Sequence, residues 1–483
     1  MAGIVAFGAH LPRYRLDRGR ILKAVGWAQP ATAARARGQK AVANHDEDAI
    51  TVAVAAARNA GAFGPGAGVG SLYLASTSAP YAERQNSAIA AEALGLGDAV
   101  RSADVTGSAR AGTTALLAAL ADVTSGRAGR ALVCAGEVRR ARPGSVEEHL
   151  LGDAGAAVCV GEEGGLAELM GSHSVSCDFP DRVRGSDRSL GRSWEERWVR
   201  DEGLLGLLPD AVSAYLARCG LEPGAFSKVV LPVASLRDAA RVARALGLAP
   251  EVLVHPLADR VGHTGAAHPL LLLCRALEEA EPGEEILVVG FGSGVDVLHF
   301  RVTDAVRSFR PRRTVGELLK MGKDLGSYER YAAFRDLLAV ETGMRGEFEP
   351  ETPMSVVWRH RRTILGLVGS RCRRCGTPQF PPQRVCANGE CRAVDEMEPY
   401  PFADRASRVF SYTADLLAWS PNPPLIYGVV DFDGGGRMMM EFTDCDLEDL
   451  AVGLPVDLVF RRKYHDRQRG IHTYFWKCVP AAS

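Results

Sequence analysis

Four cysteines near the end of the chain restrict its folding more than any other sequence feature. Cys372, Cys375, Cys386 and Cys391 follow the pattern C-x2-C-x10-C-x4-C. Two closely spaced thiolate pairs can close a tetrahedral shell around one structural Zn²⁺ ion. The spacing, with its Pro-rich connection, predicts a zinc ribbon over residues 369–395. The alternative is a set of buried free thiols.

The composition indicates a globular protein with more than one domain. The chain has 483 residues, of which 47% are hydrophobic, and 57 Lys and Arg residues balance 58 Asp and Glu residues. This near-zero charge argues against a nucleic-acid-binding protein. The first residues read as a strand rather than a signal peptide, and no apolar run approaches the ~20 residues that span a bilayer. We therefore expect a cytoplasmic protein with no nucleic-acid or membrane partner.

The hydrophobic pattern divides the chain into four parts. Residues 1–303 alternate strand-like apolar runs with Ala/Leu-rich helical runs, which is typical of a layered α/β domain. A helix followed by two strands recurs at 109–161 and 264–302, so two pseudo-symmetric halves are expected at about 1–160 and 161–303. Residues 304–368 read as a helical linker. After the ribbon, five short alternating runs over 396–483 predict a small antiparallel β-barrel.

Both ends of the chain resemble known families. The ribbon sequence SRCRRCGTPQFPPQRVC and the following strands resemble the zinc-ribbon and OB-fold proteins that accompany acyl-CoA-processing thiolase-like enzymes. Residues 1–303 resemble the thiolase superfamily, nearest the hydroxymethylglutaryl-CoA synthase and ketoacyl-ACP synthase III branch. The landmarks are HDEDAITVAVAAARNAG, LYLASTSAPYAERQNSAIAAEALGL, DVTGSARAGTTALLAAL, RPGSVEEHLLGDAGAAVCVG, VGHTGAAHPLLLL and LVVGFGSG. The resemblance implies a duplicated thiolase-like fold and a homodimer.

The catalytic positions depart from the resembled pattern. That branch uses a nucleophilic Cys at the start of a buried helix, and counting from Asp104 places Ala109 there. Thr77 stands where the branch has a general-acid Glu, and Pro232 or its neighbours stand where it has a His. An acyl-cysteine mechanism is therefore not available to this chain. Ser108 is either a substitute nucleophile, an oxyanion-site hydroxyl or a helix cap.

His263 is the remaining acid/base candidate, because the resemblance places it where a side chain polarises the thioester carbonyl. A packed or capping histidine is the alternative. His268, one turn later, precedes an apolar run and reads as structural. Gly292 and Ser293 would let the backbone approach a ligand, as Ala109 would in the helix-start turn, although a plain tight turn fits the same sequence.

Coenzyme A would need a positive surface, since Arg binds phosphate groups well. Two basic segments qualify: the ribbon, and the loop ATAARARGQK that contains Arg35. Ordinary solvated charge explains either segment equally well. Between Thr352 and Gly389 there is no acidic residue, so the ribbon is expected in a positive field.

Two functions follow from these expectations. The first is an acyltransferase- or lyase-type enzyme that makes, transfers or cleaves a carbon–carbon bond of an acyl-CoA, with His263, Ser108 and Thr77 as catalytic residues. The second is a non-catalytic acyl-CoA-binding scaffold that docks a thiolase-family partner enzyme through its zinc and OB module.

Overall fold

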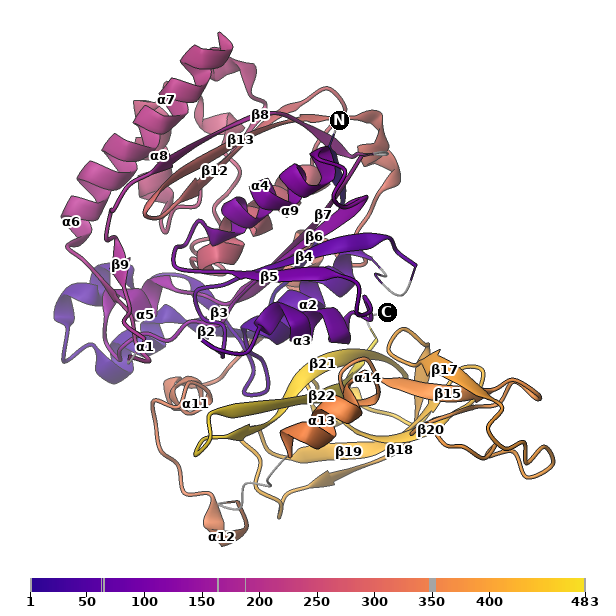
Figure 1. The fold of residues 1–483 in the computed structure, drawn as a ribbon. Coiled ribbons are helices and arrows are strands. Elements are labelled where there is room, and N and C mark those ends of the chain that lie inside the picture. The colour runs from indigo at the N-terminus through magenta and orange to yellow at the C-terminus, as the bar shows by residue number, and fades with distance from the viewer. Residues whose placement is uncertain are drawn as a thin grey trace. The chain divides into compact units, whose positions relative to one another are not determined.

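The computed structural model describes residues 2–61, 63, 66–162, 165–186, 188–346 and 353–481. These residues form two compact units (Figure 1). The first unit comprises residues up to 44, 48–91 and 96–337, and the second comprises residues 45–47, 92–95 and 338 onward. Within the described ranges, no helix is long and apolar enough to cross a bilayer.

The first unit is built on a mixed sheet with the strand order β11-β12-β13-β8-β1-β7-β6-β4-β5. Strand β4 is parallel to both β5 and β6, and β11 is parallel to β12, whereas the other neighbours are antiparallel. The bounds are β1 (Gly3–His10), β4 (Val69–Ala75), β5 (Arg101–Val105), β6 (Arg130–Glu137), β7 (Ala154–Gly161), β8 (Ala167–Ser176), β11 (Lys228–Val230), β12 (Glu285–Phe291) and β13 (Gly294–Val302). Smaller pairings join β2 (Tyr14–Asp17), β3 (Gln39–Val42) and β14 (Lys323–Asp324), and β9 (Arg182–Val183) with β10 (Arg192–Ser193).

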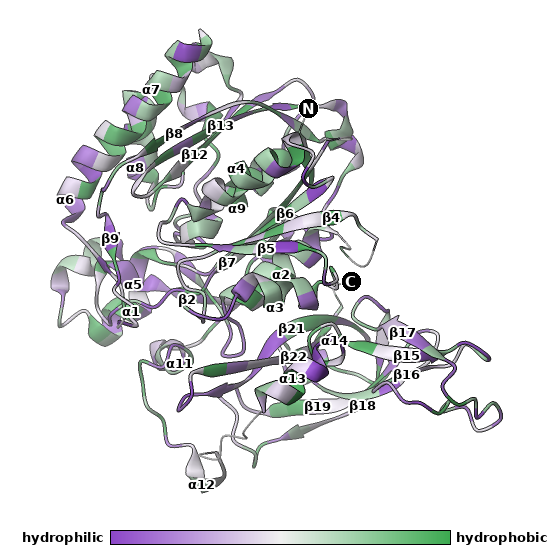
Figure 2. Ribbon diagram, viewed as in Figure 1, coloured by the Kyte–Doolittle hydropathy of each residue, from purple (hydrophilic) through white to green (hydrophobic). Residues whose placement is uncertain are grey.

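Two helices lie inside this sheet system and others cover it. Figure 1 shows α4 and α9 between the strands of the two halves, with α2 and α7 on opposite outer faces. The α9 residues 270–273 are fully buried Leu, because a helix that is hydrophobic all round must be enclosed. Figure 2 shows these inner elements mainly in hydrophobic colours. The helices are α1 (Arg18–Val25), α2 (Ala49–Ala60), α3 (Asn86–Ala93), α4 (Ala111–Thr124), α5 (Val146–Leu150), α6 (Glu196–Trp198), α7 (Leu208–Cys219), α8 (Leu236–Ala245), α9 (His268–Glu278), α10 (Val315–Lys320) and α11 (Tyr328–Phe334).

The strand order confirms the predicted duplication. Reading outward from the β1–β8 pair, β7, β6 and β4 on one side match β13, β12 and β11 on the other, with the same relative directions. Each half also contributes one inner helix. The N-termini of α4 and α9 and the β12–β13 turn all belong to the first unit.

One half-buried carboxylate on α9 should make stability depend on pH. Glu278 is half-buried and accepts a hydrogen bond from the Val315 N–H at the start of α10 (2.7 Å). Burial raises the pKa of Glu278 to about 7. The folded state therefore holds this proton more tightly than the unfolded state, so unfolding free energy falls as pH rises from the ordinary Glu value toward 7.

Glu278→Gln is expected to raise the unfolding free energy at pH 8 by about 1–2 kcal/mol, after allowance for partial exposure, and to change little at pH 4. Thermal melts at the two pH values measure this difference. Glu279→Gln, which breaks the exposed ion pair with Arg275, is the control and should change the unfolding free energy at pH 8 by less than about 1 kcal/mol. An equal shift for Glu278→Gln at both pH values would contradict the explanation.

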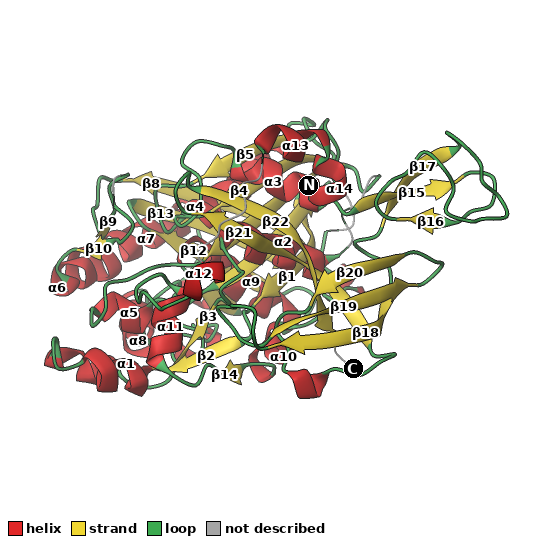
Figure 3. Cartoon of the chain, turned by 90° about the horizontal axis from the view of Figure 1, so that it is seen from below, coloured by secondary structure: helices red, strands yellow, loops and turns green. Residues whose placement is uncertain are grey.

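The second unit holds two small antiparallel sheets. The zinc-ribbon sheet has the order β16-β15-β17 and the barrel sheet the order β20-β19-β18-β21-β22 (Figure 3). A parallel bridge between Phe442 and Cys478 joins the end of β20 to β22 and brings the barrel edges together. The bounds are α12 (Gly343–Gly346), α13 (Met354–Arg359), α14 (Arg361–Ile364), β15 (Val368–Cys372), β16 (Pro378–Gln379), β17 (Met397–Pro401), β18 (Ser407–Asp415), β19 (Leu425–Phe432), β20 (Arg437–Glu441), β21 (Pro455–Asp466) and β22 (Ile471–Pro480).

The fold class predicted from sequence is confirmed. The stretch 304–368, expected as a helical linker, contains helices, but the boundary between the units falls inside it, after Leu337. Residues 304–337 belong to the first unit because Leu325, Tyr328 and Tyr331 are buried in a cluster with Tyr14 and Leu16. The boundaries at 160, 303, 368 and 395 stay predictions.

Candidate active site

The turn before α4 meets the β12–β13 turn. Ser108 Oγ donates to the Gly292 carbonyl oxygen (2.5 Å) and accepts weakly from the Arg110 N–H (3.3 Å). A Cβ added at Gly292, where φ is +144°, would lie 2.7 Å from Ser108 Oγ and 3.1 Å from the Ala109 nitrogen. Glycine is therefore required for this close approach. The arrangement places the positive end of the α4 dipole at the turn that Gly292 approaches.

A buried carboxylate fixes this arrangement. Asp296, on β13, pairs with Arg110 (2.9 Å) and accepts hydrogen bonds from Thr113, Thr114 and Ser174, each at 2.9 Å. These donors come from α4 and β8. Their convergence on one side chain holds the start of α4 against the sheet.

Thr77 is held by a carboxylate that the sequence reasoning missed. Glu137 ends β6, is fully buried, and accepts from the Thr77 N–H (2.9 Å) and hydroxyl (2.8 Å) and from Ser78 Oγ (2.5 Å). It also accepts from the Ala266 N–H (3.1 Å) at the start of the α9 region. Glu137 therefore connects Thr77 to the segment that carries His263. The available signal was an acidic residue closing an otherwise apolar strand, RALVCAGE.

Both ring nitrogens of His263 bond to the backbone. Nδ1 accepts from the Gly265 N–H (3.2 Å), so in the neutral ring the proton is on Nε2, which donates to the Pro232 carbonyl oxygen (3.1 Å). Burial, with the charges of His268, Arg182 and Arg139, holds the pKa of His263 well below its usual value. A neutral His263 is therefore a hydrogen-bond donor at pH 7 and a poor base. The His268 ring stacks on it with centroids 4.6 Å apart.

Two arginines lie near these residues and were not singled out in the sequence. Arg139 follows β6, and Arg182 belongs to β9. The next arginine on that strand segment, Arg184, donates to the Thr77 carbonyl oxygen (2.7 Å), which places the segment beside Thr77. No local sequence pattern separates Arg139 or Arg182 from ordinary surface arginines.

The predicted substrate-binding residues do not all lie at one place. The structure brings Ser108, Ala109 and Gly292 together, and Ser293, with φ of +46°, shares the Gly292 turn. Arg35 lies elsewhere, at the end of the 3₁₀ helix Pro30–Arg35, and forms an ion pair with Glu196. The basic loop around Arg35 is thus already partly neutralised.

The four cysteines of the second unit fit one metal ion. Their Sγ atoms all lie within 4.8 Å of one another, with Cys372–Cys391 at 3.9 Å and Cys375–Cys386 at 3.5 Å. Zn–S bonds of ~2.3 Å in a tetrahedron give S–S edges of about 3.8 Å, so this set suits Zn²⁺. The surrounding positive field is reduced by ion pairs of Arg371, Arg374 and Arg384 with acidic residues at 395–398.

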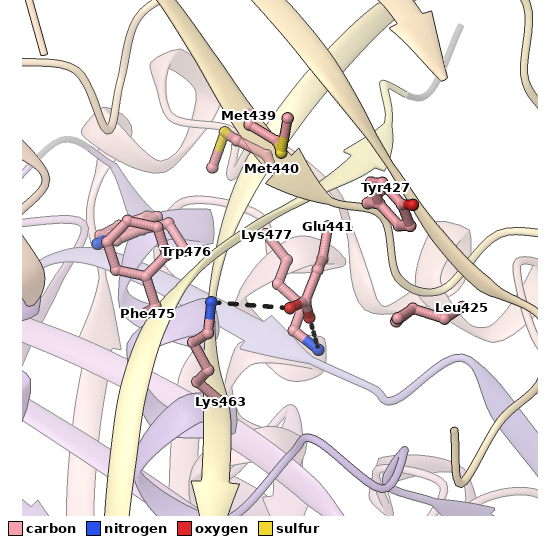
Figure 4. Close-up of a pocket in the computed structure, with 9 residues that line it drawn as sticks. All are labelled: Leu425, Tyr427, Met439, Met440, Glu441, Lys463, Phe475, Trp476 and Lys477. Atoms are coloured by element: carbon pink, nitrogen blue, oxygen red, sulfur yellow. Dashed lines mark ion pairs between the residues drawn. The ribbon is translucent and has the colours of Figure 1, made fainter. Parts of the chain in front are cut away.

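A cavity of about 240 Å³ lies in the barrel (Figure 4). Glu441 lies between Lys477 (3.0 Å) and Lys463 (3.7 Å). Lys477 also pairs with Asp46 (3.0 Å). The charged groups of this cavity therefore compensate one another, and its walls are otherwise mainly apolar: Leu425, Tyr427, Met439, Met440, Phe475 and Trp476.

Two proteins of known family are similar to most of this chain. The chain is 31% identical over 346 residues to the hydroxymethylglutaryl-CoA synthase of Methanopyrus kandleri, covering 70% of this chain and 97% of that protein. It is 32% identical over 348 residues to the hydroxymethylglutaryl-CoA synthase of Aeropyrum pernix, covering 70% and 95%. The chain belongs to the hydroxymethylglutaryl-CoA synthase family. As a synthase-family member it carries Ala109 where the resemblance predicts the nucleophilic Cys.

Domain models match three further parts of the chain, and a solved structure has a similar fold. The model for the 3-oxoacyl-[acyl-carrier-protein (ACP)] synthase III C terminal matches residues 216–298. The ChsH2 rubredoxin-like zinc ribbon domain matches residues 365–398, and the ChsH2 C-terminal OB-fold domain matches residues 402–461. MvaS in complex with 3-hydroxy-3-methylglutaryl coenzyme A has a similar fold, with a TM-score of 0.61 and 19% identity over 70% of this chain and 92% of that one. This synthase-family chain thus has a zinc ribbon and an OB-fold after its thiolase-like unit.

Proposed function

We propose that this protein acts on acyl-CoA thioesters and makes, transfers or cleaves a carbon–carbon bond without a cysteine acyl-enzyme. The observation that carries the proposal is the turn of Ser108 and Ala109 before α4, which the glycine at 292 approaches closely. Such a turn can stabilise negative charge on a thioester oxygen without attacking the carbon. The relatives of this protein include hydroxymethylglutaryl-CoA synthases, and one solved structure with a similar fold is a complex with 3-hydroxy-3-methylglutaryl coenzyme A.

Aldol or retro-aldol chemistry suits a site of this kind. In the cleavage direction the β-hydroxyl gives its proton to water, the Cα–Cβ bond breaks, and the oxygen and Cβ become the carbonyl group of the released product. The electron pair of the broken bond passes to the thioester as an enolate, which then takes a proton from water at Cα. The enolate oxygen carries the developing charge. Backbone N–H groups near Ala109 are the donors proposed for that oxygen, with Thr77 and Ser108 assisting. The Nε2–H of His263 joins them when it leaves the Pro232 carbonyl oxygen.

Mass spectrometry tests the reaction class directly. Purified protein is incubated with a panel of acyl-CoA and β-hydroxyacyl-CoA thioesters, and both the small molecules and the intact protein are weighed. We expect new or cleaved thioesters and no acyl adduct on the protein. An adduct would replace this mechanism with covalent catalysis, with Ser108 as the first residue to examine.

His263→Ala is expected to lower turnover by about 10²–10³-fold, because one oxyanion donor is lost. His263→Asn retains an amide donor and should recover part of that loss. The single-turnover rates of both variants measure the effect, with thermal melts to verify folding. Unchanged turnover in His263→Ala would remove His263 from the catalytic set.

A non-catalytic scaffold is the second candidate function, because the side chains predicted to be catalytic already form hydrogen bonds to other groups of the protein. Ser108 donates to Gly292, His263 bonds to Gly265 and Pro232, and Thr77 is bound to Glu137. Tight binding of a CoA thioester with no turnover, and co-purification of a thiolase-family enzyme that is lost on deleting residues 369–483, would favour this function.

A further inference from the structure

The cavity of the barrel is lined by a strand face that the barrel core does not use. Alternate residues of a strand point to the same face, and the intervening Ile426, Met440 and Trp476 are buried in the core. The opposite face contributes Leu425 and Tyr427 of β19, Met439 and Glu441 of β20, and Phe475 and Lys477 of β22 to the cavity. An antiparallel sheet needs only one apolar face to form a core, so the apolar side chains of this second face need another explanation.

Lys463 reaches the cavity from an irregular position in β21. The pairing of β21 with β22 shifts register between Arg462 and Tyr464, which leaves Lys463 without a partner in the described ladder. Irregularities of this kind re-aim a side chain and are common beside binding sites. Figure 4 shows the Lys463 amine directed at Glu441, with its Nζ 3.7 Å from Glu441 Oε1. The same Nζ lies 5.6 Å from the centroid of the Phe475 ring.

The ion pair between Lys463 and Glu441 is too long for a hydrogen bond. Glu441 Oε2 is held instead by Lys477 (3.0 Å). Burial alone would raise the pKa of Glu441, but the charge of Lys477 holds it below its usual value, so the carboxylate is ionised at neutral pH. Among the described residues, no hydrogen bond is made by Lys463 Nζ or accepted by Glu441 Oε1. The cavity therefore presents a cationic donor and an anionic acceptor side by side.

The charges around the cavity cancel. Lys463 and Lys477 are matched by Glu441 and by Asp46, which pairs with Lys477 (3.0 Å). A simple anion would be repelled by Glu441, and a simple cation would be repelled by Lys463. A zwitterion can place each of its charges beside the opposite charge of the protein, and both contacts are then charge-assisted hydrogen bonds.

The size and the walls of the cavity restrict the rest of the ligand. Its volume of about 240 Å³ exceeds the roughly 150 Å³ of a cavity that encloses benzene. It is below the roughly 300 Å³ at which sites for drug-sized molecules begin, so a whole coenzyme A does not fit. The rings of Tyr427 and Phe475 and the thioether of Met439 suit an aromatic group.

We propose that this cavity binds a free aromatic α-amino acid in its zwitterionic form. The ammonium group of the ligand donates to Glu441 Oε1, and its carboxylate accepts from Lys463 Nζ. Its ring packs against Tyr427, Met439 and Phe475. The site belongs to the second unit and has no part in the thioester chemistry proposed for the first.

Isothermal titration of the full-length, zinc-containing protein tests the inference with L-phenylalanine and three truncated probes. The probe 3-phenylpropionate lacks the ammonium group, 2-phenylethylamine lacks the carboxylate, and alanine lacks the ring. We expect phenylalanine to bind about 10–100-fold more tightly than each probe, because each probe loses one charged contact or the burial of the ring. This comparison uses the unaltered protein and needs no variant.

Two variants should each remove one preference and keep the other. Glu441→Gln should reduce the preference for phenylalanine over 3-phenylpropionate to less than about threefold and leave the preference over 2-phenylethylamine. Lys463→Met should do the reverse. A merely structural role for either residue would weaken all ligands alike and would not produce this crossed pattern.

Arg437→Met is the matched control. Arg437 also lies on β20, but its side chain is 53% exposed and pairs with Asp431. This variant should keep every preference of the unaltered protein. Thermal melts establish that each variant is folded.

Four outcomes would overturn the inference. The first is equal binding of phenylalanine and its probes, or no binding of phenylalanine at roughly 10 mM. The second is tighter binding of 3-phenylpropionate than of phenylalanine, which would indicate an anion site. The third is preferences that survive both variants, and the fourth is displacement of phenylalanine by free CoA. The thioester assay does not depend on this cavity, so either proposal can fail alone.

Discussion

Cys386→Ser is expected to abolish zinc binding and unfold the ribbon of the second unit. Cys386 is buried, with its Sγ 3.5 Å from that of Cys375, and one Ser hydroxyl is a poor substitute for a thiolate ligand. The hydrophobic cluster of the ribbon contains only Cys372, Cys386 and Ala393 as buried members among the described residues. With so small a core, metal binding worth about 10–16 kcal/mol supplies the folding free energy.

Metal analysis and limited proteolysis measure this effect. The unaltered protein should contain about one zinc per chain, and the variant should lose it and be cleaved within residues 369–395. Cys177→Ser, which alters an exposed thiol of the first unit, is the control and should retain zinc. A zinc-free unaltered protein, or full zinc content in Cys386→Ser, would contradict the assignment of this site.

Arg335→Met is expected to lower the unfolding free energy of the first unit by about 3–5 kcal/mol. Arg335 and Asp153 form an ion pair in which each side chain is 3% exposed. Asp153 also accepts from the Ala43 N–H (2.8 Å), and Arg335 donates to the Ala43 carbonyl oxygen (3.1 Å). Removing the guanidinium leaves a buried carboxylate without its counter-charge, which costs more than the pair contributes.

Urea unfolding of three variants isolates this cause. Arg20→Met breaks an exposed pair with Asp324 and should cost less than about 1 kcal/mol. Arg335→Met combined with Asp153→Asn removes both charges and should recover part of the loss. If Arg335→Met costs no more than Arg20→Met, the buried pair is not the source of stability.

Local sequence patterns were enough to predict several elements of this fold. The helix expected at about 109–125 is α4 (Ala111–Thr124), and the apolar run after His268 forms the fully enclosed α9. The cysteine spacing likewise brought four thiols within reach of one ion. In each case the interacting residues are near one another in sequence, or the pattern repeats with the period of the element.

The same patterns do not show which charges are neutralised or buried, so the substrate-binding role of Arg35 stays a prediction. The basic loop ATAARARGQK suggested a phosphate-binding surface, but Lys40 is 3% exposed and donates to the Glu148 carbonyl oxygen (2.7 Å). Arg35 pairs with Glu196. A run of basic letters does not reveal whether a partner more than a hundred residues away will bury or neutralise it.

The sequence by itself determined the thiolase-like layers, the zinc ribbon, the OB-fold and the absence of a cysteine at Ala109. Only the tertiary structure decided that Glu137 binds Thr77 and that both nitrogens of His263 bond to the backbone. The reason is physical. Secondary structure and metal spacing follow from local geometry, whereas hydrogen-bond partners and pKa shifts depend on distances between segments that folding brings together.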